Sequence, residues 1–249
     1  MNLQFDHIIH YVKGIDTLHF PGNKLKLTPG GQHMTLGTKN ILSRIDLSYI
    51  EFIDIFNQQL IEQAMQDENE RLSFASSLGR TDYEEGFVRL CYRTDNIEDL
   101  NEHFKSKGLK TIGPLQMERV TPTGECIRWQ LLYIDKAYDF ELPFFIEWGA
   151  NDKTRYHELE GAMQRHLKID TIVIETTDFD RTAEVFVEWL DYEVVGGVIN
   201  TYFLLKKKDA PNIKIIPGNS NKIRRLEMKT QDASLIGEHL VHEAVYAFI

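Results

Sequence analysis

The segment FDHIIHYVKGID, residues 5–16, holds the pattern that decides the fold: a short apolar strand followed by a polar break. Three later segments share this design, namely FVRLCYRTDNIEDL (87–100), KIDTIVIETTDFD (168–180) and IRRLEMKTQDAS (223–234). When the polar breaks are aligned, His7, Arg89 and Thr171 take equivalent strand positions, 82 residues apart in both steps. This constant spacing indicates an internal duplication of one structural unit.

Helices are expected after the second and third of these strands, because both have start and stop signals. Asp95 or Asn96 can cap a helix that ends at Gly108. Asp178 or Asp180 can cap the helix of the third repeat in the same way.

The first and last repeats differ from the middle two. Pro21 and Gly22 shorten the helix of the first repeat, and the stretch PGGQH at 29–33 predicts a loop. In the last repeat, Asp232 is followed by LIGEHLVHEAVYAF (235–248), which predicts a closing helix.

Short apolar runs after each expected helix predict strands. They lie at 41–56 (two strands with a turn near Asp46), 126–134, 142–149, 200–208 and 212–218. Each unit therefore has the predicted order β-α-β-β-β. A polar, acidic insert at 57–86 is expected to be largely helical, and a linker at 149–167 places a boundary near residue 155.

Composition limits the classes of partner. The 249 residues are 42% hydrophobic, enough for a sizeable core, and 28 Lys and Arg against 38 Asp and Glu give a net charge of −10. This acidity argues against nucleic-acid and anionic-membrane partners. Two cysteines are too few for a disulfide framework. MNLQFDHI lacks the pattern of a signal peptide, so none is expected, and no apolar run has the length of a membrane span. A cytoplasmic protein that binds a small molecule is expected.

A duplicated unit that opens with Asp-His-Ile and closes its first copy with Tyr-Ile-Glu resembles the vicinal oxygen chelate superfamily. That superfamily includes glyoxalases, extradiol dioxygenases and bleomycin-binding proteins. PGGQH, GTKN (37–40) and YIEFI (49–53) are similar to its glyoxalase-like branch. The resemblance implies an α+β fold whose paired units form open, cupped mixed sheets. It implies a glyoxalase-like domain at 1–150, a degenerate and truncated second pair at 151–249, and a possible homodimer.

The resemblance further implies metal ligands on the first and last strands of each unit. By position, His7 and Glu51 take these places in the first unit, and Glu147 takes the last-strand place in the second. The fourth place holds Arg89, which cannot ligate a cation because it is always charged. A divalent metal (Mn, Fe(II), Ni, Mg or Zn) is expected, and no nucleotide cofactor.

Strand alternation supports a site independently of the resemblance. His7 would share a face with Phe5 and Ile9, and both glutamates lie within strongly apolar runs. A buried carboxylate must be neutralised by protonation, by an arginine or by a metal. Two interpretations remain open: a metal bound by His7, Glu51 and Glu147, or a salt bridge from Arg89 that fills the same position.

The first functional hypothesis is a metal-dependent lyase or isomerase of glyoxalase type. A small oxygen-rich metabolite would chelate the metal through two adjacent oxygens, and Glu51 or Glu147 would move a proton. Arg89, with Arg44 or Arg128, would hold an anionic group of the substrate. His33 would cover the site or add a ligand.

Two rival hypotheses belong to other classes. One is a metal-free binding protein that sequesters a small molecule such as an antibiotic, with Arg89 neutralising the carboxylates. The other is an extradiol dioxygenase, which fits less well because such sites use two histidines and one glutamate.

Overall fold

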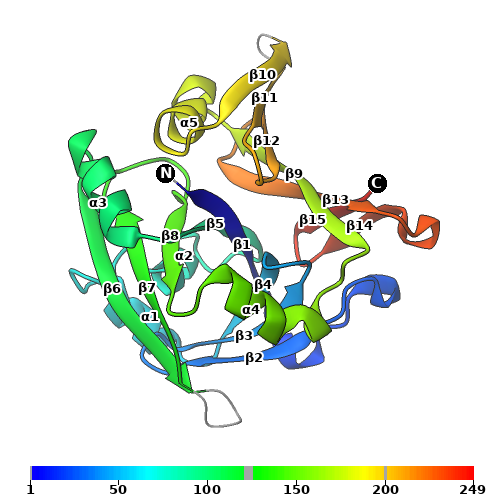
Figure 1. The fold of residues 1–249 in the computed structure, drawn as a ribbon, viewed down its shortest axis with the longest axis horizontal. Coiled ribbons are helices and arrows are strands. Elements are labelled where there is room, and N and C mark those ends of the chain that lie inside the picture. Colours follow the sequence, from blue (N-terminus) through cyan, green and yellow to red (C-terminus); the bar gives the residue numbers. More distant parts are fainter. Residues whose placement is uncertain (1, 121–125, 199–200) are drawn as a thin grey trace.

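Four units follow one another along the chain, each opening with a long strand (Figure 1). The computed structural model describes residues 2–120, 126–198 and 201–249. The first unit consists of β1 (Leu3–Tyr11), the 3-10 turns η1 (Ile15–Thr17) and η2 (Pro21–Asn23), β2 (Thr28–His33), β3 (Thr38–Arg44) and β4 (Tyr49–Ile55). After helices α1 (Gln58–Ala64) and α2 (Phe74–Arg80), the second unit consists of β5 (Gly86–Thr94), α3 (Ile97–Ser106), β6 (Thr111–Val120), β7 (Cys126–Ile134) and β8 (Phe144–Trp148).

The second half repeats this order and then shortens it. It opens with the connecting helix α4 (Asp152–Leu159) and the turn η3 (Glu160–Ala162). The third unit consists of β9 (Leu167–Thr176), α5 (Phe179–Glu184), the π-helical turn η4 (Val185–Trp189), β10 (Glu193–Val198), β11 (Tyr202–Lys206) and β12 (Asn212–Pro217). The fourth consists of β13 (Lys222–Thr230), the turn η5 (Ala233–Leu235), β14 (Gly237–Val241) and β15 (Ala244–Phe248).

Each unit is held together by a parallel pairing of its first and last strands. The pairs are β1 with β4, β5 with β8, β9 with β12 and β13 with β15. The first strands of neighbouring units then pair antiparallel, β1 with β5 and β9 with β13. The two halves join where Ile223 of β13 meets Phe87 of β5. This is the predicted α+β architecture of paired units, and in Figure 1 β2–β4 and β6–β8 flank the central strands β1 and β5.

Most predicted elements are present. Asn96 caps α3 through its side-chain oxygen, Gly108 follows that helix with a φ of 76°, and Asp178 caps α5. The strands predicted at 41–56, 126–134, 142–149, 200–208 and 212–218 correspond to β3 and β4, β7, β8, β11, and β12; Asn200 lies outside the described residues. No helix in the described part of the chain is long and apolar enough to span a membrane.

The predicted closing helix at 235–248 is wrong, because this segment forms the β14–β15 hairpin. His242 and Glu243 at its tip both have positive φ, 42° and 62°, as a tight two-residue hairpin turn requires. Valine, tyrosine and phenylalanine favour strands, and β15 gains a parallel partner in β13. Pairing of β15 with β13 therefore outweighs the helical pattern.

The predicted loop at 29–33 is also wrong, since these residues belong to β2. This strand lies at the edge of the sheet, where the missing N–H of Pro29 is tolerated. The register with β3 shifts between Pro29 and Gly31, which indicates a bulge. A Cβ on Gly30 would lie 2.0 Å from Oδ1 of Asn40, so only glycine allows this close approach.

A cluster of buried apolar side chains fills the inner face of the first half. The insert at 57–86 contributes Ile61, Phe74 and Leu78 to this cluster from α1 and α2. The insert is thus partly helical, as predicted, and its helices pack against the inner face of the sheet formed by β1–β8. It thereby covers the side of the sheet that carries the candidate site.

Candidate functional site

The cup of the first half encloses a cavity beside β1, β3, β4, β7 and β8. Its volume is about 40 Å³, room for an ion or a few water molecules. Phe74 of α2 closes it by packing against His33 and Phe144. The polar side chains of the lining include His7, His33, Asn40, Arg44, Glu51 and Arg119.

A bulge in β1 places a carboxylate beside the imidazole of His7. The register with β5 shifts between Phe5 and His7, which leaves Asp6 without a paired residue and re-aims its side chain. Oδ1 of Asp6 lies 2.8 Å from Nδ1 of His7, and both residues are buried. Trp148 donates its Nε1–H to Oδ2 of Asp6 at 3.0 Å, and Arg155 Nη2 lies 3.6 Å from the same oxygen.

These contacts keep Asp6 ionised. Burial alone would raise the pKa of Asp6, but the hydrogen bond to His7 and the charges of His7, Arg155 and Arg93 outweigh it and lower the pKa to about 2. An ionised Asp6 holds the proton of His7 on Nδ1. Nε2 of His7 then faces the cavity, where a second proton or a cation can occupy it.

This Nε2 atom faces a second carboxylate. Oε2 of Glu51 lies 3.3 Å from Nε2 of His7, while Asn40 donates its side-chain N–H to Oε1 of Glu51 at 2.5 Å. Nε2 of His7 is buried and makes no hydrogen bond with the described residues. Two buried acceptors this close repel each other unless a proton or a cation lies between them. The pair is therefore built to hold one or the other.

Strand register explains why His7 and Glu51 meet. In the parallel pair β1–β4, Tyr49 lies opposite His7 and Glu51 lies opposite Ile9. The ring of Tyr49 stacks on the imidazole with centroids 4.6 Å apart. The structure thus brings together two of the three predicted metal ligands.

Two arginines border the cavity without a carboxylate partner. Arg44 is 9% exposed, its guanidinium lies over the ring of Tyr49 at 5.0 Å, and its Nη1 is buried without a hydrogen bond in the described structure. Burial lowers the pKa of Arg44. Arg119 of β6 approaches Gly31 and has no hydrogen bond or ion pair to any residue that the structure describes. The site therefore carries local positive charge in an acidic protein.

His33 also reaches the cavity, from strand β2. Its Nδ1 lies 3.0 Å from Oγ1 of Thr38, and its ring packs edge-on against Phe74 at 4.9 Å. Burial lowers the pKa of His33 despite the opposing charge of Glu51, so the imidazole is neutral near pH 7. A neutral imidazole in this position is available as a ligand or as an acceptor.

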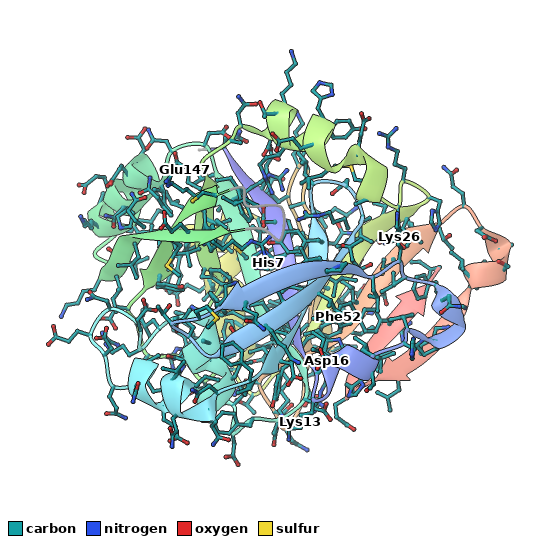
Figure 2. The ribbon with its side chains drawn as sticks, turned by 90° about the horizontal axis from the view of Figure 1, so that it is seen from below. His7, Lys13, Asp16, Lys26, Phe52 and Glu147 are labelled. Atoms are coloured by element: carbon teal, nitrogen blue, oxygen red, sulfur yellow. The ribbon has the colours of Figure 1, made fainter. Side chains whose placement is uncertain are left out.

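Glu147 does not join the site, which corrects the prediction for this residue. Register places Phe144 opposite Cys91, and Phe144 and Ile146 line the cavity. Strand alternation then turns Glu147 to the other face, where its Oε2 accepts a hydrogen bond from the backbone N–H of Ile97 at 2.6 Å. Figure 2 shows Glu147 near the edge of the molecule and His7 near its middle.

Glu147 instead caps helix α3, and this role gives a testable expectation. Glu147→Gln should lower the free energy of unfolding by about 0.3–1 kcal/mol, because a carboxylate stabilises the N-terminus of a helix. Binding in the His7 cavity should not change. Urea unfolding measures the change in stability, and elemental analysis measures the metal content. A loss of metal in this variant would show that Glu147 is a ligand after all.

Arg89 has neither of its predicted roles. It is fully buried, and its guanidinium donates to the carbonyl oxygens of Leu142 at 2.5 Å and Leu72 at 2.7 Å. Its nearest carboxylate is Glu141, at 3.9 Å. Arg89 therefore ties α2 and the approach to β8 to β5, and the described contacts include no bond from it to Glu51 or to a cavity ligand.

Arg128 lies outside the cavity as well. It is exposed and pairs with Glu118 at 3.2 Å. It lines an outer hollow that shares Arg44, Arg119 and Trp148 with the cavity. Of the three arginines predicted to hold a substrate, the structure places Arg44 alone at the cavity.

Several residues of the site were not predicted from the sequence. Asp6 was missed because strict alternation turns residues 6 and 7 to opposite faces, and a bulge leaves no simple sequence signal. Asn40, Arg119 and Arg155 were missed because their positions depend on sheet register and on the packing of α4. Asn40 lies in GTKN and Asp6 in the Asp-His-Ile opening, two segments that carry the resemblance.

A second grouping of possible ligand atoms fits a metal less well. One atom each from Asp6, His7 and Cys91 lies within 4.8 Å of the others. Burial raises the pKa of the Cys91 thiol well above its usual value, so that the thiol stays protonated. Asp6 and Nδ1 of His7 are already hydrogen-bonded to each other.

Comparison with known proteins agrees with this architecture. A family model described as a glyoxalase-like domain matches residues 5–190. The crystal structure of a hypothetical protein from Staphylococcus aureus has 31% identity and a TM-score of 0.95, with 99% of each chain covered. None of the curated proteins matches the sequence.

More distant structures share the fold. A Mn(II)-bound glyoxalase from Novosphingobium aromaticivorans has 13% identity and a TM-score of 0.52, covering 92% of this chain and 66% of that one. An extradiol ring-cleaving dioxygenase from B. fuscum has 11% identity and a TM-score of 0.53, covering 92% and 57%. The family match and the relative from S. aureus show that this chain belongs to the glyoxalase-like domain family of the vicinal oxygen chelate superfamily.

Proposed function

We propose that the chain is a metal-dependent enzyme of glyoxalase type, a lyase or isomerase that acts on a small oxygen-rich metabolite at the His7–Glu51 cavity. The observation that carries this proposal is the unpartnered Nε2 of His7, buried 3.3 Å from Oε2 of Glu51. Two ligand atoms on one divalent ion, each bound at about 2.1 Å, lie about 3 Å apart. The separation of these two atoms is close to that value.

His7 and Glu51 are the two candidate ligands that the structure brings together. His33 offers a second neutral imidazole at the cavity wall, but its ring nitrogens do not lie within 4.8 Å of both. Asp6 stands behind His7 as the carboxylate that usually orients a metal-binding histidine. Nitrogen and oxygen donors without thiolate suit Mn, Fe(II), Ni, Mg or Zn. An ion bound here would supply Lewis-acid stabilisation to two adjacent substrate oxygens.

The protein's own side chains supply the proton chemistry. Glu51 is held by Asn40 through Oε1, and its Oε2, when it is not bound to the ion, can accept a proton from a substrate carbon or hydroxyl. Phe74, Trp129 and Phe144 exclude bulk water, which strengthens the interaction of Glu51 with a bound substrate. One distant structural neighbour is described as a Mn(II)-bound glyoxalase, which supports the choice of this class.

Metal content tests the proposal before any substrate is known. The full chain, purified without chelator or affinity tag, should contain about one divalent ion per chain by elemental analysis. His7→Ala should lose it, and Asp6→Asn should weaken its binding by at least about tenfold. His157→Ala, which removes an exposed histidine of α4, is the matched control and should keep the metal.

A metal-free result would reject the enzyme proposed here. If neither the purified protein nor protein loaded with these ions retains metal, the proton between His7 and Glu51 is the remaining explanation. Nitrogen NMR of the His7 imidazole would then detect a proton shared between Nε2 and Glu51. A metal-free binding protein, neutralised by His7 itself, would replace the metalloenzyme.

A further inference from the structure

An excess of positive charge lies at the outer end of the His7–Glu51 cavity. Both buried carboxylates there, Asp6 and Glu51, are engaged by other side chains. Arg44 is nine-tenths buried with an unpartnered Nη1, and Arg119 forms no hydrogen bond or ion pair within the described ranges. Burying an unpaired guanidinium is costly, and such a group in a cleft is typical of a binding site.

Both guanidinium groups lie where two hollows meet. Arg44, Arg119 and Trp148 line the inner cavity and also an outer hollow of about 570 Å³. The outer hollow is bordered by β7 and by the end of α4. Its volume falls in the range of small-molecule sites, whereas the inner cavity alone is too small for a metabolite. A ligand that fills the outer hollow and reaches the inner cavity therefore extends across the two arginines.

Strand register gives the order of groups along this path. Across β3 and β4, Arg44 lies opposite Tyr49, and Leu42 lies opposite Glu51. Positions two residues apart on one strand face are separated by about 7 Å. Arg44 is therefore one step outward from Glu51, and a molecule entering from the outer hollow meets the arginines first.

We infer that Arg44 and Arg119 form a subsite for a carboxylate or phosphate group, so that the substrate is a small anionic metabolite. Guanidinium groups bind both kinds of group through paired N–H donors. The anionic group would neutralise the arginines and direct the oxygen-bearing end of the molecule toward His7 and Glu51. The inference rests on the proposed function for its reaction, but its evidence is the unpaired charge.

Inorganic phosphate and malonate are the probes for this subsite. Isothermal titration of the full chain, at low and constant ionic strength, should detect saturable binding of at least one of them. Arg44→Met and Arg119→Met should each weaken that binding at least tenfold. Arg128→Met is the matched control, because Arg128 lines the same outer hollow but is exposed and paired with Glu118. The tighter probe distinguishes a phosphate from a carboxylate subsite.

Two results would overturn the inference. One is the absence of binding of both anions to the wild-type protein at tens of millimolar; the other is equal weakening by Arg128→Met, which would indicate a diffuse charge effect. Arg119 is only partly buried, so its variant remains informative if Arg44→Met fails to fold. His7→Ala should still bind the anions. Anion binding without metal therefore rejects the proposed function alone, and metal without anion binding rejects the subsite alone.

Discussion

Asp6→Asn is expected to weaken metal binding at His7 by about 10- to 100-fold and to destabilise the protein by about 2–4 kcal/mol. Asp6 is fully buried and lies 2.8 Å from Nδ1 of His7. An amide in its place keeps the shape but removes the charge that fixes the imidazole proton. It also leaves Arg155, 5% exposed and 3.6 Å away, without the buried half of its ion pairing.

The same variant should change the response to acid. The pKa of Asp6 is lowered from 3.8 to about 2, so its ionisation adds stability that is complete above pH 3.8 and is lost as the pH falls through 2. This shift corresponds to roughly 2 kcal/mol. Between pH 4 and pH 2 the wild-type protein should lose that share of its free energy of unfolding, whereas Asp6→Asn should not.

Urea unfolding at pH 7, 4, 3 and 2 measures both effects, and metal titration at pH 7 measures the affinity. Asp152→Asn is the control, because Asp152 pairs with Arg93 and Arg155 but is partly exposed. Asp152→Asn should lower the free energy of unfolding by less than about 1 kcal/mol. Identical acid profiles for wild type and Asp6→Asn would contradict the ionised, buried carboxylate.

The half of the site in the first unit could be predicted from the sequence. His7 and Glu51 lie on the first and last strands of one unit, and these two strands pair in every unit of the chain. Their side chains meet whenever the unit closes, whatever the rest of the fold does. The resemblance placed both residues on these strands, and the apolar run around each agreed with a buried site.

The half of the site in the second unit could not be predicted in this way. Which face Glu147 takes depends on where β8 begins after the connection from β7, and a shift of one residue reverses every side chain. Register places Phe144 opposite Cys91, so the position that matches Glu51 in the second unit holds an aromatic ring. The charge of Arg89 was correctly recognised, but the carbonyl groups that it binds come from segments distant in sequence.

The wrong prediction for the last repeat has a similar cause, because its conformation depends on a partner strand that the local sequence does not reveal. Its helical pattern at 235–248 was a local signal, whereas the β14–β15 hairpin is stabilised by pairing with β13. Local propensity differences are small beside the burial of Tyr246 and Phe248 in the core. A partner strand supplied by the fold therefore decides the conformation of this segment.

Arg89→Met is expected to destabilise the protein by about 3–5 kcal/mol, the cost of breaking a buried charged network by removing one partner. Burial lowers the pKa of Arg89 to about 10, so the guanidinium is charged at pH 7. Its N–H groups satisfy the carbonyls of Leu72 and Leu142 and the hydroxyl of Ser77. Methionine fills part of the volume but removes the donors of the Leu72 and Leu142 carbonyls. Ser77 keeps its bonds to Arg80 and Glu141.

The control for Arg89→Met is Arg80→Met. Arg80 binds the same carboxylate, Glu141, but is partly exposed, so its loss should cost about 1 kcal/mol or less. Urea unfolding compares the two variants, and hydrogen exchange should increase in α2 of Arg89→Met because Leu72 and Ser77 lose their anchor. An equal loss of free energy of unfolding in Arg89→Met and Arg80→Met would contradict the role given to the buried Arg89 network. Since Phe74 closes the cavity from that same segment, Arg89 acts on the site by holding its cover in place rather than by touching a ligand.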